Sequence, residues 1–143
     1  MTFYAVIDTN VLVSSMLKGN SVPAQVISHV VSGKIIPVLH RDIFAEYVRV
    51  LPRKKFKFPI SKIDEMLEDI IKRAIFVDTD NLSELNEIFQ DPKDVVFYEV
   101  VMEARKERDA YLVTGNLKHF PLKTFIVTPR EMLDIINQSN ESE

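Results

Sequence analysis

The chain has 143 residues, 46% of them hydrophobic, and a formal net charge of −3. This length and apolar content fit one domain with a sizeable buried core. Cysteine is absent, which excludes disulfides, thiolate metal sites and a cysteine nucleophile, so any metal must be held by oxygen or imidazole. Because no apolar run reaches the length of a membrane span and no signal-peptide pattern begins the chain, we expect a soluble, cytoplasmic protein.

The first predicted element is a strand over residues 3–7, and Asp8 and Asn10 follow it directly. Proteins of the α/β class place their sites at such strand ends, and a carboxylate beside a carboxamide suggests metal or phosphate chemistry. Both residue types also form turns and cap helices, so a purely local role stays open.

Strand-like and helix-like segments then alternate along the chain, with local signals at the helix ends. Gly33 and Pro52 are stop signals, whereas Ser61 with Asp64, and Thr128 with Glu131, have the spacing of capping boxes. The predicted strands are 3–7, 35–39, 74–77, 111–114 and 125–127, and the predicted helices are 21–31, 41–51, 61–73, 82–89, 92–107 and 129–137.

Alternation of this kind favours right-handed crossovers and strands that run in parallel. We therefore predict an α/β protein, a three-layer α/β/α fold with a mostly parallel sheet of about five strands. One domain is expected over residues 1–137, followed by a polar C-terminal tail over residues 138–143.

Loops at the carboxyl ends of parallel strands share one edge of the sheet, so distant acidic residues can meet there. Glu46 lies in the middle of the helix after the second strand, where a carboxylate that leans inward would reach the edge occupied by Asp8. Asp91 and Asp94 open the helix that precedes the fourth strand. Each residue also has a purely structural explanation. Glu46 could be a solvent-facing helical glutamate, and the two aspartates could form a capping box.

The fourth strand is followed by a polar turn that contains Thr114 and Asn116, and then by Lys118 and His119. Asn116 has the properties of a turn residue. We assign His119 no catalytic role, because a lone histidine between such neighbours is more often a surface or packing residue.

A basic segment interrupts an otherwise acidic chain, and two phenylalanines, Phe56 and Phe58, are interleaved with its charges. We predict that it guides an RNA backbone towards the acidic residues. The alternative is a solvated loop whose aromatic rings pack into the core. The basic residues of this segment are Arg53, Lys54, Lys55 and Lys57.

Taken in order, Asp8-Thr9-Asn10, the helical Glu46, Asp91-Pro92-Lys93-Asp94, and Thr114-Gly115-Asn116 with Lys118-His119-Phe120 resemble the PIN-domain nuclease family. The closest resemblance is to the branch described as toxins of bacterial and archaeal toxin-antitoxin pairs. It implies a PIN-like fold, metal-dependent cleavage of RNA, and a small antitoxin protein that blocks the site. The resemblance also makes a homodimer a reasonable expectation.

The resemblance assigns roles to individual positions. Asp8, Glu46 and Asp94 match the invariant carboxylates, and so would be both catalytic residues and metal ligands, with Asp91 as a nearby candidate. Asn10 and Thr114 match residues that support the site. Asn116 stands where many members have an aspartate, so the fourth acid is missing, which leaves a second metal ion in doubt and keeps an inactive RNA- or protein-binding module as the alternative.

The chemistry of the reaction gives an independent reason for such a cluster. A divalent cation lowers the pKa of a bound water and neutralises charge on the phosphate, and Mg²⁺ or Mn²⁺ suits oxygen ligands. A phosphoacceptor signalling domain, with Asp78 or Asp80 as extra acids, and a dehalogenase-type phosphatase are weaker alternatives. The first lacks a lysine before Pro129, and the second lacks an acid at Asn10.

Overall fold

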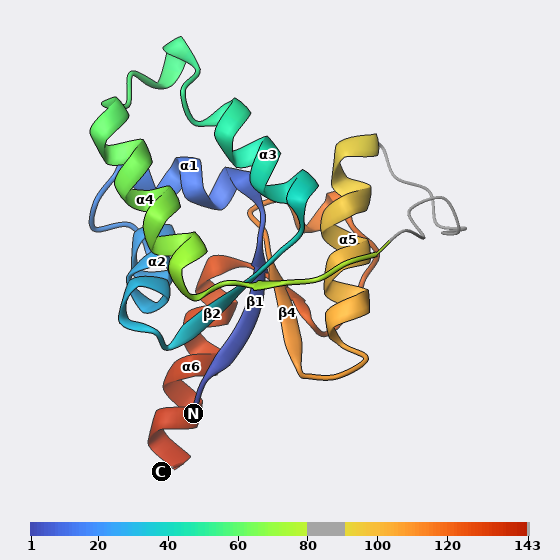
Figure 1. Ribbon diagram of the computed structural model, residues 1–143. Helices are drawn as coiled ribbons and strands as arrows, with labels where there is room; N and C mark the ends of the chain where they lie inside the picture. The colour runs from blue at the N-terminus through green and yellow to red at the C-terminus, as the bar shows by residue number, and fades with distance from the viewer. Residues whose placement is uncertain (80–90, 143) are drawn as a thin grey trace.

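The computed structural model describes residues 1–79 and 91–142 (Figure 1). Five strands form one sheet in the order β3-β2-β1-β4-β5, and each neighbouring pair is parallel. The strands are β1 (Phe3–Ile7), β2 (Ile35–Leu39), β3 (Ile75–Phe76), β4 (Ala110–Val113) and β5 (Ile126–Val127).

Helices connect the strands, and two single-turn 3₁₀ helices precede α4 and β5. The α-helices are α1 (Thr9–Leu17), α2 (Val22–Ser32), α3 (Arg41–Val50), α4 (Ile60–Arg73), α5 (Pro92–Ala104) and α6 (Pro129–Ser142), and the 3₁₀ helices are η1 (Lys54–Phe56) and η2 (Leu117–His119). Within residues 1–79 and 91–142, no helix has the length and apolar character needed to cross a membrane.

The sheet lies between two layers of helices, which confirms the predicted three-layer α/β/α class. Helix α5 packs on β1, β2 and β4, whereas α2 packs on β2 and on α6, which contacts β5 (Figure 1). The central strands β1 and β4 are almost wholly buried, as expected for a parallel sheet covered on both faces.

Several predicted boundaries are confirmed by the contacts that set them. The Ser21 hydroxyl caps α2, and Gly33 ends that helix at a φ of 87°, a left-handed conformation that favours glycine. Thr128 and Glu131 form the predicted reciprocal capping box at the start of α6.

Other boundaries differ from the prediction. The box expected from Ser61 and Asp64 is wrong, because α4 already begins at Ile60 behind Pro59 and has no side-chain cap. The third strand is limited to Ile75–Phe76, and α5 ends at Ala104 rather than near residue 107. Helix α6 continues past the expected end at residue 137, into the segment predicted as a tail, and the predicted helix 82–89 lies outside the described residues.

Candidate functional site

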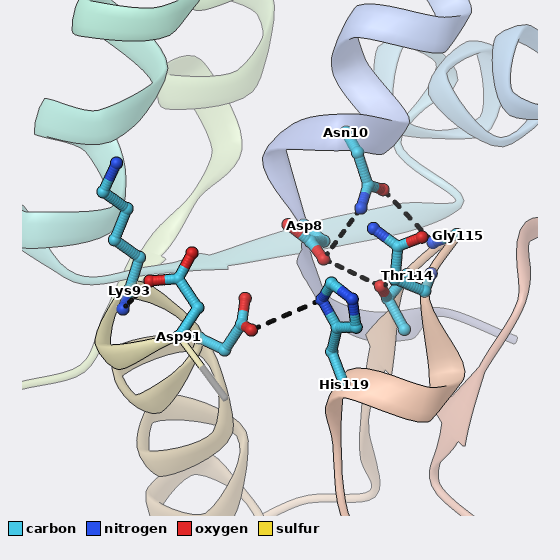
Figure 2. Close-up of polar contacts among 9 residues, drawn as sticks. Asp8, Asn10, Asp91, Lys93, Thr114, Gly115 and His119 are labelled. Atoms are coloured by element: carbon cyan, nitrogen blue, oxygen red, sulfur yellow. Dashed lines mark hydrogen bonds and ion pairs between the residues drawn. The ribbon is translucent and has the colours of Figure 1, made fainter. Parts of the chain in front are cut away.

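Asp8 and Thr114 lie side by side at the carboxyl edge of the sheet. The last residues of β1 and β4, Ile7 and Val113, are paired in register, so the residues that follow them are neighbours. The Thr114 hydroxyl donates a hydrogen bond of 2.7 Å to Asp8 Oδ2, and both residues are buried (Figure 2). Asp8 occupies the N-cap position of α1 without a side-chain cap hydrogen bond, and its contact with Thr114 joins two strand ends that are far apart in the sequence.

Asn10 joins the same hydrogen-bonded group. Its Nδ2 donates to Asp8 Oδ2 at 3.1 Å, and its Oδ1 accepts the backbone N–H of Gly115 at 3.1 Å (Figure 2). The carboxamide therefore ties the start of α1 to the turn after β4 and orients the Asp8 carboxylate. Asn10 and Thr114 thus both contact the Asp8 carboxylate.

Helix α3 brings Glu46 to this edge. The adjacent Tyr47 is fully buried, and its hydroxyl donates to the carbonyl of Ile7, which fixes α3 against the end of β1. Glu46 is only 9% exposed, and its Oε2 accepts a hydrogen bond from the Thr9 hydroxyl. The structure therefore places Glu46 at the edge and not on the solvent-facing side of its helix.

The two aspartates at the start of α5 have different environments. Asp91 is exposed and caps the helix, since its Oδ1 accepts the backbone N–H of Lys93 at 3.0 Å (Figure 2). Asp94 has a side chain only 14% exposed, and its buried Oδ2 has no hydrogen-bond partner among the described residues. Asp91 therefore behaves as a cap, and Asp94 is the carboxylate directed into the site.

The carboxylates act on one another electrostatically. Burial and then the charge of Asp8 raise the pKa of Asp94 to about 6. Asp91 and Glu46 act in the same direction with smaller effects, and His119 opposes the shift. Burial and the charge of Glu46 raise the pKa of Asp8, against the hydrogen bond from Thr114. The negative charges of Asp8 and Glu46 therefore disfavour ionisation of Asp94, and the charge of Glu46 disfavours ionisation of Asp8.

The negative charges of the cluster also affect the buried Tyr47. Its pKa is raised well above the ordinary value of 10.0 by burial and then by the negative charges of Asp8 and Glu46. The phenol therefore stays protonated and remains a hydrogen-bond donor to the end of β1. Positive charge near the cluster comes from Arg49, which lies 3.8 Å from Glu46 Oε1.

Across residues 1–79 and 91–142, no group of three or more His, Asp or Glu side chains is arranged to hold a metal ion. The donors are nonetheless suited to a hard cation, because they are carboxylate oxygens at one sheet edge and Asp94 Oδ2 is buried without a partner.

The turn after β4 supplies two further features. Asn116 contributes its backbone N–H, which donates to the Thr114 hydroxyl at 3.0 Å. His119 Nδ1 lies 3.5 Å from Asp94 Oδ2 (Figure 2), a proximity that the sequence analysis did not predict. The available signal was its position just after the Thr114-Gly115-Asn116 turn, at the same sheet edge.

A hollow of about 250 Å³ lies between Glu46 and part of the basic segment. Arg53 and Phe56 line it, whereas Phe58, which stacks on Phe56 at 5.4 Å, packs against the hydrophobic core. The core-packing alternative therefore holds for Phe58, whereas Phe56 lines the hollow. The residues that line the hollow are Thr9, Asn10, Val13, Glu46, Val50, Arg53, Phe56 and Lys93.

The remaining basic residues of the segment, Lys54, Lys55 and Lys57, are exposed around η1. Lys93 is a basic residue that sequence reasoning missed, because its proximity to Glu46 depends on the packing of α5 beside α3. Positive side chains therefore border the acidic cluster from two separate elements.

A family model described as PIN domain matches residues 4–118 of the chain. No curated protein and no solved structure matches the chain. The matched range includes Asp8, Glu46, Asp94 and Thr114, and ends just before His119.

Proposed function

The chain belongs to the PIN-domain family, and from that premise we propose that it is a metal-dependent endoribonuclease. The observation that carries the proposal is the meeting of Asp8, Glu46 and Asp94 at one sheet edge, where the charges of Asp8 and Glu46 help to raise the pKa of Asp94. Such a concentration of carboxylates is costly for the fold alone and is offset when a cation binds.

The order of the strands argues against the phosphoacceptor alternative. Receiver-type signalling domains have the doubly wound order 2-1-3-4-5, whereas this sheet has the order β3-β2-β1-β4-β5. Two extra acids were considered for that alternative. Asp78 follows β3, which pairs with β2 and not with β1, and Asp80 lies outside the described residues.

In the proposed site, Asp8, Glu46 and Asp94 hold one Mg²⁺ or Mn²⁺, directly or through water. The bound cation would lower the pKa of a water molecule and neutralise charge that develops on the phosphate. Thr114 and Asn10 hold Asp8 Oδ2 in place, and the Thr9 hydroxyl does the same for Glu46 Oε2. Preformed hydrogen bonds of this kind reduce the reorganisation that binding requires.

We assign the binding of RNA to the hollow and the basic segment beside it. Arg53 and Lys93 face the same hollow as Glu46, so a phosphate placed there is attracted by the cations and lies close to the carboxylates. Lys54, Lys55 and Lys57 extend the positive surface away from the site and would follow the backbone of a single strand.

The proposal is tested by incubating the purified protein with mixed RNAs in Mn²⁺ and, separately, in EDTA. Cleavage is expected in Mn²⁺ and is abolished by EDTA. Asp8→Asn is expected to reduce cleavage by more than about 100-fold, since even residues behind metal ligands contribute about 10- to 100-fold. Asp134→Asn, at an exposed position of α6, is the matched control.

RNA binding without cleavage in either condition would favour the alternative, an inactive RNA- or protein-binding module. The absence of a fourth acid at Asn116 is the feature of this chain that points to that alternative.

We further propose that the protein is the toxin of a toxin-antitoxin pair, acts in the cytoplasm and is held inactive by a small antitoxin protein. Expression in a bacterial host should then arrest growth, whereas expression of the Asp8→Asn variant should not. If the host grows normally while the wild-type protein cleaves RNA, the toxin proposal fails and the nuclease proposal stands. Sedimentation of the purified protein tests the expected homodimer.

A further inference from the structure

An aromatic ring, that of Phe56, lines the hollow beside Glu46. Phe56 belongs to η1, the single turn between α3 and α4 at the top of Figure 1. Side chains three residues apart in a 3₁₀ turn lie one above the other, so Phe56 is on the same side of the turn as Arg53, which lines the same hollow. A cation and a flat apolar surface therefore face the hollow together, beside the Glu46 carboxylate.

Phe58 fixes the orientation of this ring. The two rings are stacked, with centroids 5.4 Å apart and planes at 15° to each other, and Phe58 in turn packs against the hydrophobic core. In the part of the chain that the structure describes, the core and the side chains packed against it include Phe58 but not Phe56. Phe56 is therefore a half-buried ring that is held from one side and does not fill the core.

The backbone between the two rings is strained. Lys57 has a φ of 58°, and among the described residues it is the only one besides glycine with a positive φ. A residue with a Cβ disfavours this left-handed conformation, so the surrounding structure must hold it there. The conformation closes the turn, since the Lys57 N–H donates to the Lys54 carbonyl at 3.2 Å. Strain of this kind gathers at ligand-binding sites, and here it accompanies the stacking of Phe56 on Phe58.

An aromatic face beside cations is an arrangement that binds single-stranded nucleic acid. Stacking on an aromatic ring contributes affinity with every base, because each base has a π face, and neighbouring cations hold the phosphates. The exposed Lys55 lies over the Phe56 ring, with its ammonium 5.2 Å from the centroid. A base can displace this solvated side chain, which leaves the ammonium close to the phosphate of the same nucleotide.

We propose that Phe56 stacks on an unpaired base of the RNA, in the nucleotide next to the phosphate that lies at Glu46, while Arg53 holds the adjoining phosphate. The inference rests on the proposed function in one respect, the binding of RNA in the hollow. A base inside a duplex is paired and already stacked, so it cannot reach the ring. The protein therefore takes single-stranded RNA at this position, with little preference among the bases.

The test is titration of the protein into short single-stranded RNAs that each carry one 2-aminopurine, in EDTA so that no cleavage interferes. Stacking quenches the fluorescence of 2-aminopurine, and wild type should quench it. Phe56→Leu should lose the quenching and weaken binding by about 5- to 100-fold, whereas Phe56→Trp should keep both. With a complementary strand annealed, wild type and Phe56→Leu should bind equally. Phe76→Leu, at an exposed phenylalanine of β3, is the matched control and should behave as wild type.

Quenching and affinity that are unchanged in Phe56→Leu would overturn the proposal, and so would an equal loss in Phe76→Leu. If Phe56→Trp also loses the quenching, the ring only supports the turn and the proposal fails. If binding then still depends on Lys54 and Lys55, the proposed function survives without the stacked base. If quenching depends on Phe56 but wild type cleaves no RNA in Mn²⁺, this inference stands and the nuclease proposal fails. If wild type binds none of the RNAs, both fail.

Discussion

Replacement of Asp94 by asparagine should make the metal-free protein more stable while removing its response to metal. Burial and the charge of Asp8 raise the pKa of Asp94 from 3.8 to about 6. The folded state therefore binds this proton more tightly than the unfolded state, so the contribution of Asp94 to stability is greatest below pH 3.8 and is lost as the pH rises to about 6. Asparagine cannot ionise and avoids this loss.

The size of the effect follows from the same shift. A change from 3.8 to about 6 corresponds to about 3 kcal/mol at full strength, and solvent at the rim of the site reduces this to about 1 kcal/mol. At pH 8 the free energy of unfolding of Asp94→Asn should exceed that of wild type by about 1 kcal/mol, and its Tm should be higher by roughly 3–4 °C.

The assay is urea denaturation in EDTA at pH 8 and at pH 4.5, repeated with Mn²⁺. The advantage of Asp94→Asn should shrink at pH 4.5, where Asp94 of the wild type is protonated in the folded state. Mn²⁺ at about 100 times its dissociation constant should add about 2.7 kcal/mol to wild type only, which reverses the order of the two proteins. The reasoning is refuted if Asp94→Asn is no more stable than wild type at pH 8, or if Asp134→Asn gains as much.

Three further predictions test the parts of the site separately. Thr114→Val should lower the free energy of unfolding at pH 7 by about 1–3 kcal/mol, because Asp8 loses a buried hydrogen bond. Thr114→Ser should restore the lost stability, and an unchanged urea midpoint for Thr114→Val would contradict this. Changing Lys54 and Lys55 together to alanine should reduce the salt slope of RNA binding by about 1.4, and an unchanged slope eliminates their role as RNA contacts. Tyr47→Phe should lower the free energy of unfolding by about 1 kcal/mol, because the buried carbonyl of Ile7 loses this donor. Thermal unfolding measures the change, and a Tm equal to that of wild type would show that this hydrogen bond does not fix α3.

Periodicity and cap chemistry were sufficient to predict the fold class from the sequence. The strands at 3–7 and 35–39 have the predicted limits, because short β-branched runs between polar segments leave few alternatives. The order of the strands was not predictable in this way, although it decides the site. Asp8 and Thr114 share a hydrogen bond only because β1 is next to β4.

The position of Glu46 shows where local reasoning ends. Its place in the middle of a helix could be read from the sequence, but its burial depends on the contact of Tyr47 with the end of β1. In the same way, the approach of His119 to Asp94 joins two segments whose proximity is a tertiary property. The family resemblance could identify the candidate carboxylates, and packing decided which of their neighbours act on them.

The central claim is tested most directly by an anomalous difference map from crystals grown with Mn²⁺. The account predicts a peak at the carboxyl edge of the sheet, about 2.2 Å from oxygens of Asp8 and Asp94, with Glu46 bound directly or through one water. A map with Mn²⁺ only at other surfaces, and with these three carboxylates directed towards separate partners, would contradict it.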